Sequence, residues 1–135
     1  MRMVFIFLLG TLLLAAQEKQ IKKVPITPIA ANDGKAMFDN YCATCHGLDG
    51  KGQGPARPAL KGTPVDLTLL AQKNGGKFPA AHVSSTLRQV DQPVHGSKEM
   101  PVWGPLLSSV SGSSQAEIQM RISNLTKYIE SLQVQ

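Results

Sequence analysis

Three residues close together in the sequence have side chains suited to chemistry: Cys42, Cys45 and His46, in the pattern Cys-x-x-Cys-His. This pattern is the attachment signature of a c-type haem. Two thiols three residues apart lie on nearly the same side of a helical turn, so both can reach the two vinyl groups of one porphyrin. The imidazole of the next residue then lies under the iron as an axial ligand. The motif therefore predicts one covalent haem c, attached through Cys42 and Cys45 and ligated by His46.

Three different kinds of site could use the same residues, but each fits less well. A thioredoxin-type redox pair requires a βαβ setting, and no strand pattern precedes Cys42. A zinc site requires a second ligand pair, but His82 and His95 lie much further apart in the chain than the paired histidines of such sites. A disulfide between cysteines this close is strained and leaves His46 unexplained. A haem site accounts for all the residues of the motif.

The N-terminus has the features of an export signal. Arg2 gives a minimal positive region, and residues 4–16 carry no charge. The length of this stretch matches a signal-peptide core and falls short of the ~20 residues of a membrane-spanning helix. We therefore expect a signal peptide at 1–16, an extended tether at 17–31 and one domain at 32–135, with an uncleaved N-terminal anchor as the alternative. Export to the periplasm also favours haem attachment, because unpaired thiols rarely persist in an oxidising compartment.

The composition excludes several classes of protein. With 135 residues, two cysteines and 17% charged residues, the chain is not a disulfide-dense miniprotein, a polytopic membrane protein or a disordered polymer. The net charge is +5, and the lysines that contribute to it are scattered along the chain. No basic run is interleaved with aromatic residues, so the sequence gives no support for nucleic-acid binding. These lysines form a solvated surface or, alternatively, a face that steers an acidic partner. Aromatic residues make up only 5%, so a central haem would supply apolar surface that the core otherwise lacks.

The second axial ligand is expected from far along the chain, because it must reach the opposite face of the haem. Met100 lies far beyond His46 and is followed by Pro101, which stiffens the backbone of its loop. The other methionines are Met1, Met3, Met37 and Met120. The first two leave with the signal peptide, the third lies on the helix that leads into the motif, and the last suits the core of the final helix. His95 and His82 remain as rivals, since an imidazole is the stronger ligand and would lower the reduction potential.

The elements that must position these ligands are helices and long loops. A short helix is expected to begin at the cap residue Asn32, with Asp33 in its first turn, and to run through the Cys-x-x-Cys-His motif. Gly47 ends it. The five glycines and three prolines of 47–64 forbid regular structure and indicate a wrapped loop.

Three further helices are predicted, and no segment alternates with the period of a strand. Asp66 caps a short helix at 67–73, and a weaker helix covers 80–89. The clearest helix begins at Ser114, where Glu117 follows three residues later and apolar residues recur at helical spacing up to residue 132. The predicted fold class is therefore all-α.

These features together resemble class I c-type cytochromes, in particular the small bacterial monohaem cytochromes c, over residues 32–133. Gly34 and Phe38 match the family's first-helix positions, and Leu125 and Tyr128 match the last-helix pair that crosses them. The resemblance implies a small cytochrome c fold, in which the N- and C-terminal helices cross and long loops wrap around one covalent haem.

The resemblance also implies roles for two loop residues. Pro58, twelve residues after His46 in the segment Pro-Ala-Leu-Lys-Gly, resembles the proline whose carbonyl accepts the Nδ1–H of the axial histidine. Trp103 resembles the tryptophan that closes the haem pocket near a propionate, and plain packing is an equal alternative for it. The segments 50–55 and 64–68 are also similar to those of bacterial members.

The expected function is one-electron transfer rather than an enzymatic reaction, because His46 and Met100 together leave no iron position open to a substrate. We expect a periplasmic electron carrier that shuttles electrons between redox partner proteins such as an oxidase or a reductase complex. One alternative is a small haem subunit held peripherally on a larger membrane oxidoreductase. The others are a haem enzyme or gas sensor in which Met100 is displaced, and a haem domain that serves only in assembly.

Overall fold

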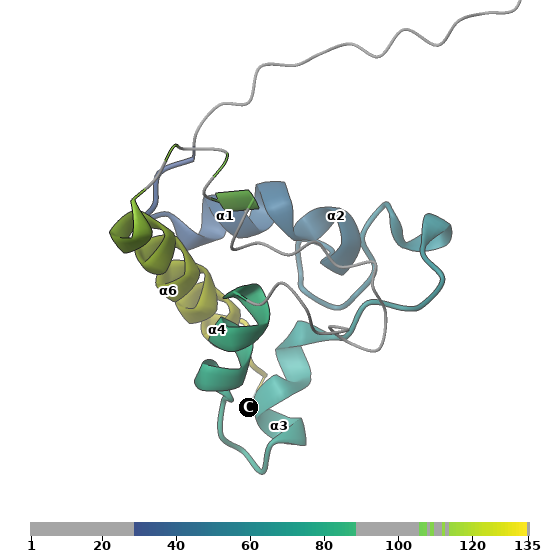
Figure 1. The fold of residues 1–135 in the computed structure, drawn as a ribbon. Helices are drawn as coiled ribbons and strands as arrows, with labels where there is room; N and C mark the ends of the chain where they lie inside the picture. Colours follow the sequence, from purple (N-terminus) through teal and green to yellow (C-terminus); the bar gives the residue numbers. More distant parts are fainter. Residues whose placement is uncertain (1–28, 89–105, 108, 110–111, 113, 135) are drawn as a thin grey trace, which may run out of the picture.

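The computed structural model describes residues 29–88, 106–107, 109, 112 and 114–134, and every regular element in this part of the chain is a helix. The elements in chain order are α1 (Gly34–Tyr41), α2 (Ala43–His46), the 3-10 helices η1 (Arg57–Ala59) and η2 (Leu67–Leu69), α3 (Leu70–Lys73), α4 (Ala80–Arg88) and α6 (Gln115–Ser131) (Figure 1). The all-α prediction is confirmed. The predicted signal peptide and residues 17–28 of the tether lie outside the described residues.

The first predicted helix is two helices joined at Cys42. The side chain of Asp33, not of Asn32, caps α1 by accepting a hydrogen bond from the N–H of Ala36 at 2.8 Å. Cys42 is the C-cap of α1 and the N-cap of α2, with φ −110° and ψ −37°. The single turn of α2 ends at Gly47, whose φ of 79° is left-handed and therefore suits glycine. The motif therefore lies on a separate turn that follows α1 directly.

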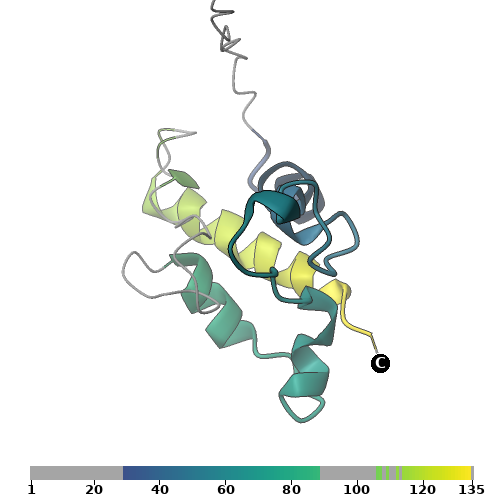
Figure 2. The same cartoon turned by 90° about the vertical axis from the view of Figure 1, so that its right-hand side faces the viewer.

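The long C-terminal helix α6 follows its sequence signals closely. Ser114 caps it by accepting from the N–H of Glu117 at 3.3 Å. Its buried apolar residues are Ile118, Ile122, Leu125 and Ile129. This stripe packs against α1 on one side and α4 on the other, and Figure 2 shows α6 lying between them. The helix therefore forms the centre of the hydrophobic core.

The crossing of α1 and α6 matches the expected one. A Cβ added to Gly34 would lie 2.3 Å from the backbone oxygen of Asn124, so only glycine permits this approach. One turn further on, the rings of Phe38 and Tyr128 lie 5.2 Å apart at 54°, a favourable tilted arrangement. Phe38 is fully buried between the helices.

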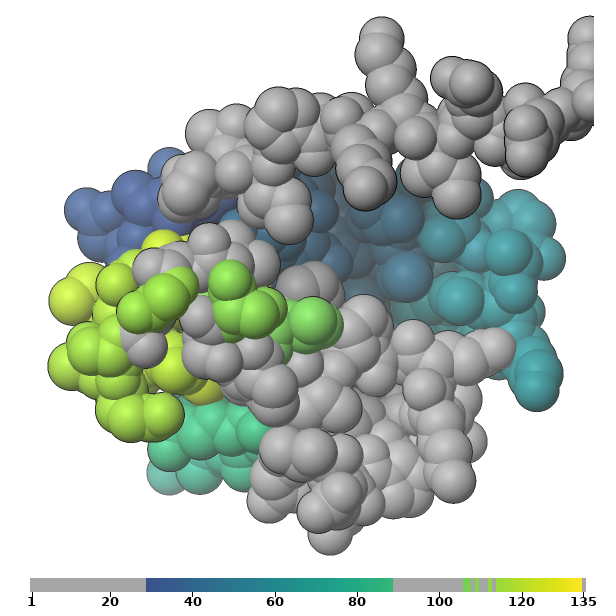
Figure 3. Space-filling model, turned by 45° about the horizontal axis from the view of Figure 1, so that its top comes forward, coloured from purple at the N-terminus to yellow at the C-terminus, as the bar shows by residue number. Residues whose placement is uncertain are grey.

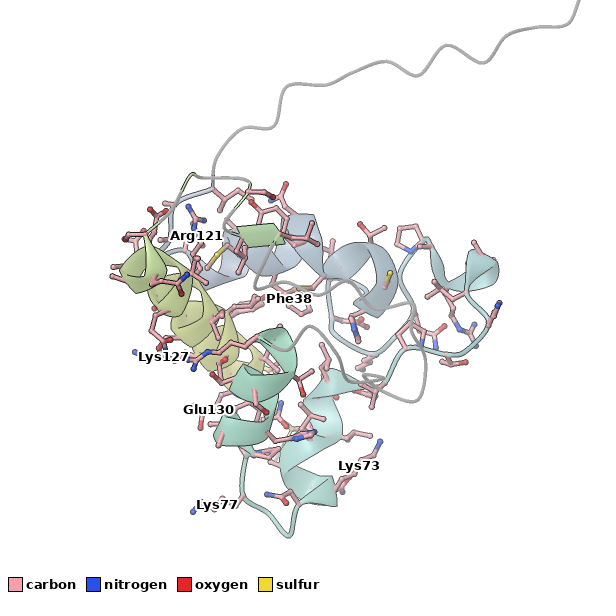
Figure 4. All side chains as sticks on the ribbon, viewed as in Figure 1. Phe38, Lys73, Lys77, Arg121, Lys127 and Glu130 are labelled. Atoms are coloured by element: carbon pink, nitrogen blue, oxygen red, sulfur yellow. The ribbon has the colours of Figure 1, made fainter. Side chains whose placement is uncertain are left out.

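The domain begins earlier than the sequence suggested. Arg121, only 3% exposed, donates to the carbonyl of Ile29 at 2.5 Å and pairs with Glu117 at 2.7 Å. Asn124 donates to the carbonyl of Ala31 at 3.0 Å. Figure 4 shows Arg121 at the end of α6 that lies beside the start of α1. Two polar side chains of α6 therefore hold carbonyls of residues 29–31, so this part of the predicted tether packs against the domain.

The remaining short elements line the other side of the molecule. Asp66 caps η2 as predicted, by accepting from the N–H of Thr68 at 2.9 Å, and α3 follows directly. In the space-filling view the loop after α2, coloured teal, lies at the end of the molecule away from α6 (Figure 3). Among the described helices none is both long and apolar enough to cross a membrane.

Candidate functional site

The three residues of the motif lie on one tight turn. The N–H groups of Cys45 and His46 both donate to the carbonyl of Cys42, at 3.1 and 2.9 Å. Cys42 and His46 are buried, Cys45 is half-buried, and the two thiols do not form a disulfide. The turn thus brings two thiols and one imidazole together, and the disulfide alternative does not describe this structure.

His46 is fixed through one ring nitrogen. Its Nδ1 lies 3.1 Å from the carbonyl oxygen of Val65. A carbonyl can only accept, so Nδ1 carries the proton and Nε2 is the nitrogen suited to coordinate a metal. Burial lowers the pKa of His46, although the hydrogen bond to Val65 partly opposes this effect. The neutral imidazole that results is the form that ligates iron.

The prediction that Pro58 accepts from the axial histidine is wrong for this structure. Pro58 lies exposed in η1, whereas the acceptor is Val65, 19 residues after His46. The reason is the path of the loop: η1 turns outward, and the chain returns beside α2 where the N–H of Leu67 donates to Gly50 at 2.8 Å. Val65 belongs to the segment 64–68, which already resembled the family in sequence.

The glycine-rich loop completes the end of α2. A one-turn helix leaves its last carbonyls without intrahelical partners. The loop supplies them: Ala56 N–H donates to Thr44 at 2.9 Å, Gly54 to Cys45 at 3.0 Å and Gly52 to His46 at 2.7 Å. A Cβ on Gly54 would lie 2.4 Å from the oxygen of Thr44, and one on Gly52 would lie 2.3 Å from that of Pro64. The glycine density of the sequence indicated a wrapped loop, but it did not show that these glycines hold α2.

The chemistry of these residues fits a c-type haem. Cys42 and Cys45 would carry the porphyrin through thioether bonds, and His46 would ligate the iron through Nε2. Burial and the neighbouring Cys45 raise the pKa of Cys42 to about 12, so its unattached thiol is neutral at physiological pH. Among the described residues no group of three or more His, Cys, Asp or Glu side chains could hold a metal ion.

The predicted residues of the other haem face are not all within the described structure. Met100, Trp103 and the rival ligand His95 lie outside it. The second rival, His82, is exposed on α4. Met120 is 49% exposed on α6, so its assignment to the core is wrong. The side of α6 that it occupies faces away from the stripe that packs on α1 and α4.

Sequence reasoning missed one residue that supports the site from a distance. Gln133, just beyond α6, donates through Nε2 to the carbonyl of Leu67 at 2.7 Å. Leu67 follows Val65 by two residues, so the C-terminal end of the chain holds the segment that holds His46. No local signal marks a glutamine near a chain end for this role.

Comparison with known proteins agrees with the geometry. The family model described as "Cytochrome c" matches residues 31–133. Cytochrome c-554(547) of Halothiobacillus neapolitanus is 28% identical over 101 residues, which cover 73% of this chain and 92% of that protein. No solved structure matches the chain significantly. The matched range contains both thiols, the imidazole of His46 and the crossing helices described above, and the chain belongs to the cytochrome c family.

Proposed function

We propose that this protein is a periplasmic one-electron carrier whose haem iron is ligated by His46 and Met100. Membership of the cytochrome c family makes it a haem-based electron carrier with a covalently bound c-type haem. Its compartment and its axial ligands are what we propose beyond that. The observation that supports the ligation most directly is the placement of both thiols and an Nδ1-anchored imidazole on one buried turn.

The haem supplies one-electron exchange between Fe(III) and Fe(II) when it is bound, and the chain's own residues control its surroundings. The hydrogen bond to Val65 fixes the His46 ring and its tautomer, and it makes Nε2 more basic. A ring held in this way need not reorient when the iron changes charge. Burial of His46 and Cys42 also excludes water from this side of the site.

Met100 is proposed as the second ligand on sequence grounds. It stands far beyond His46 in the chain, next to Pro101, whose fixed φ limits the motion of the loop backbone. A thioether opposite an imidazole raises the potential relative to two imidazoles. It also leaves no position for a substrate, which favours electron transfer between redox partner proteins over catalysis.

Two measurements test the attachment and the ligand set. The chain carrying haem should keep its haem after denaturation, and the double variant Cys42→Ala/Cys45→Ala should release it. The oxidised protein should show the charge-transfer band of a thioether–iron bond, and Met100→Ala should abolish it. Met120→Ala is the matched control, because that methionine is exposed on α6. A band that is missing from the wild type, or that survives in Met100→Ala, would overturn the Met100 assignment.

The proposed compartment is tested separately by fractionation and N-terminal sequencing. The uncharged stretch 4–16 supports cleavage before Gln17. A mature protein recovered from the periplasm with Gln17 at its N-terminus agrees with a freely diffusing carrier. An uncut N-terminus in the membrane fraction would instead support the anchored alternative.

A further inference from the structure

The last described residues of the chain bond to the segment that follows Val65, whose carbonyl faces Nδ1 of His46. The N–H of Val134 donates to the carbonyl of Thr68 at 3.0 Å. The side chain of Gln133 bonds to residues 67 and 71 of the same segment. These contacts join residues more than 60 positions apart, so they form only when the fold is complete. They place the C-terminus beside η2 and α3, as Figure 2 also shows.

Gln133 uses its whole side-chain amide. Its Nε2 donates to Leu67 at 2.7 Å and to Ile129 at 2.9 Å, and its Oε1 accepts from the N–H of Ala71 at 2.8 Å. If the amide were reversed, its oxygen would face the carbonyls of Leu67 and Ile129, and its NH2 group would face the N–H of Ala71. The network therefore fixes one orientation of the amide. A side chain held at three points, half-buried, is a rigid support for Leu67.

The segment that contains Val65 is restrained at its other contacts as well. The N–H of Leu67 donates to Gly50 at 2.8 Å, while its carbonyl accepts from Gln133. Asp66 accepts from the N–H of Thr68 at 2.9 Å and from its hydroxyl at 2.6 Å. Both sides of Leu67 are therefore bonded, one to the loop after α2 and one to the end of α6. Because Val65 lies only two residues before Leu67, these bonds also restrict where the carbonyl of Val65 can lie.

We propose that Gln133 is a positioning residue for the axial histidine. By holding Leu67 it keeps the Val65 carbonyl in line with the Nδ1–H of His46. A well-placed acceptor increases the basicity of Nε2, which stabilises Fe(III) over Fe(II). Loss of Gln133 weakens that hydrogen bond and raises the reduction potential. The inference rests on the proposed role of His46 as iron ligand, and it assigns to the C-terminal end of the chain a function in tuning the haem.

The test compares two variants of α6 and its extension in the haem-loaded protein. Gln133→Met removes the amide with little change of length, and Asn124→Leu is its control in the middle of α6. Asn124 also donates through its amide to two carbonyls, of Ala31 and Met120, both at 3.0 Å. Gln133→Glu is the variant closest in shape: it keeps an oxygen for Ala71 but places a second oxygen, in place of the donor, against the carbonyls of Leu67 and Ile129.

Two readouts separate positioning from plain stability. The midpoint potential is measured by redox titration, and the His46 Nδ1–H resonance and its solvent exchange are followed by NMR of the reduced protein. Both Gln133 variants should shift the resonance upfield and speed its exchange, and the uncharged variant Gln133→Met should also raise the potential. Asn124→Leu should lower the unfolding midpoint and leave both readouts at wild-type values.

Opposite outcomes overturn the inference. If Gln133→Met and Gln133→Glu reduce stability but leave the potential and the Nδ1–H signal unchanged, Gln133 is only structural. If Asn124→Leu shifts both readouts equally, the effect is general. His46→Ala distinguishes failure of the underlying ligand assignment: a variant that keeps the wild-type haem spectrum refutes His46 as ligand, and with it both proposals. Loss of that spectrum together with silent Gln133 variants refutes this inference alone.

Discussion

Gly34 lies directly against the backbone of Asn124, so that a Cβ on the glycine would be 2.3 Å from the asparagine's carbonyl oxygen. This contact sets how closely α1 approaches α6. Because α1 leads straight into the cysteine turn, this contact with the Asn124 backbone also sets where Cys42, Cys45 and His46 lie relative to the core. The absence of a side chain at Gly34 thus links the helix crossing to the position of the site.

Gly34→Ala should push the two helices apart. The added methyl group cannot be accommodated by a flexible neighbour, since it meets backbone atoms, and overpacking of this kind costs about 1–3 kcal/mol. We expect a lower midpoint in chemical denaturation followed by circular dichroism. Gly62→Ala is the control, because a Cβ there meets nothing within 4 Å. Equal midpoints for the two variants would show that the contact does not limit the crossing.

Arg121→Met should destabilise the domain by about 1–3 kcal/mol, the cost of leaving a part-buried backbone carbonyl without its partner. The carbonyl of Ile29 loses its donor, while Glu117, which is 36% exposed, can be solvated. The measurement is the free energy of unfolding, together with the rate of proteolysis near residues 29–31. Lys35→Met breaks an exposed pair with Asp39 and serves as the comparison. Proteolysis that is as slow in Arg121→Met as in the wild type would contradict the role of Arg121 in holding this segment.

Gly54→Ala should disturb the cysteine turn itself. Its Cβ would lie 2.4 Å from the oxygen of Thr44 and 2.5 Å from that of Ala43, so the loop must move away from α2 and give up the hydrogen bond to Cys45. We expect a smaller fraction of chains with covalent haem, measured by mass spectrometry, and a lower unfolding midpoint. Gly62→Ala, in the same loop, should match the wild type in both. Full haem attachment in Gly54→Ala would show that the loop adapts without cost to the turn.

The stability of the protein should depend on Asp66 in acid. The hydroxyl of Thr68 holds the pKa of this carboxyl below its usual value of 3.8. Because the folded-state pKa is the lower one, the carboxylate stabilises the fold above pH ~4, and this contribution is lost as the pH falls through the lowered pKa.

Asp66→Asn keeps an oxygen for the cap and does not titrate. Its free energy of unfolding, measured by denaturation at a series of pH values, should therefore fall less steeply below pH ~4 than that of the wild type. Parallel curves for the two proteins would mean that the hydrogen bond from Thr68 does not stabilise the charged form.

Local sequence signals predicted the elements well where the determining contacts are short. Asp66 and Ser114 are caps because their side chains bond to N–H groups two or three residues ahead. The apolar stripe of α6 follows from the period of a helix and needs no knowledge of the fold. The cap of α1 was misplaced by one residue, since Asn32 and Asp33 are both good caps and the choice between them depends on geometry. The break at Cys42 had no signal at all.

The haem-attachment motif on α2 could be recognised from its spacing alone, whereas the hydrogen bond that holds His46 could not. The motif spans five consecutive residues, so its two thiols and its imidazole, from Cys42, Cys45 and His46, can be read directly from the sequence. Which carbonyl faces Nδ1 depends on how the loop at 47–64 travels before it returns, and that path is set by contacts with the turn and with the C-terminal end of the chain. Val65 instead of Pro58, the packed residues 29–31 and the role of Gln133 all depend on long-range hydrogen bonds. Such bonds join residues that are neighbours only after folding, and for this reason the motif reveals the cofactor while the folded chain determines what holds it.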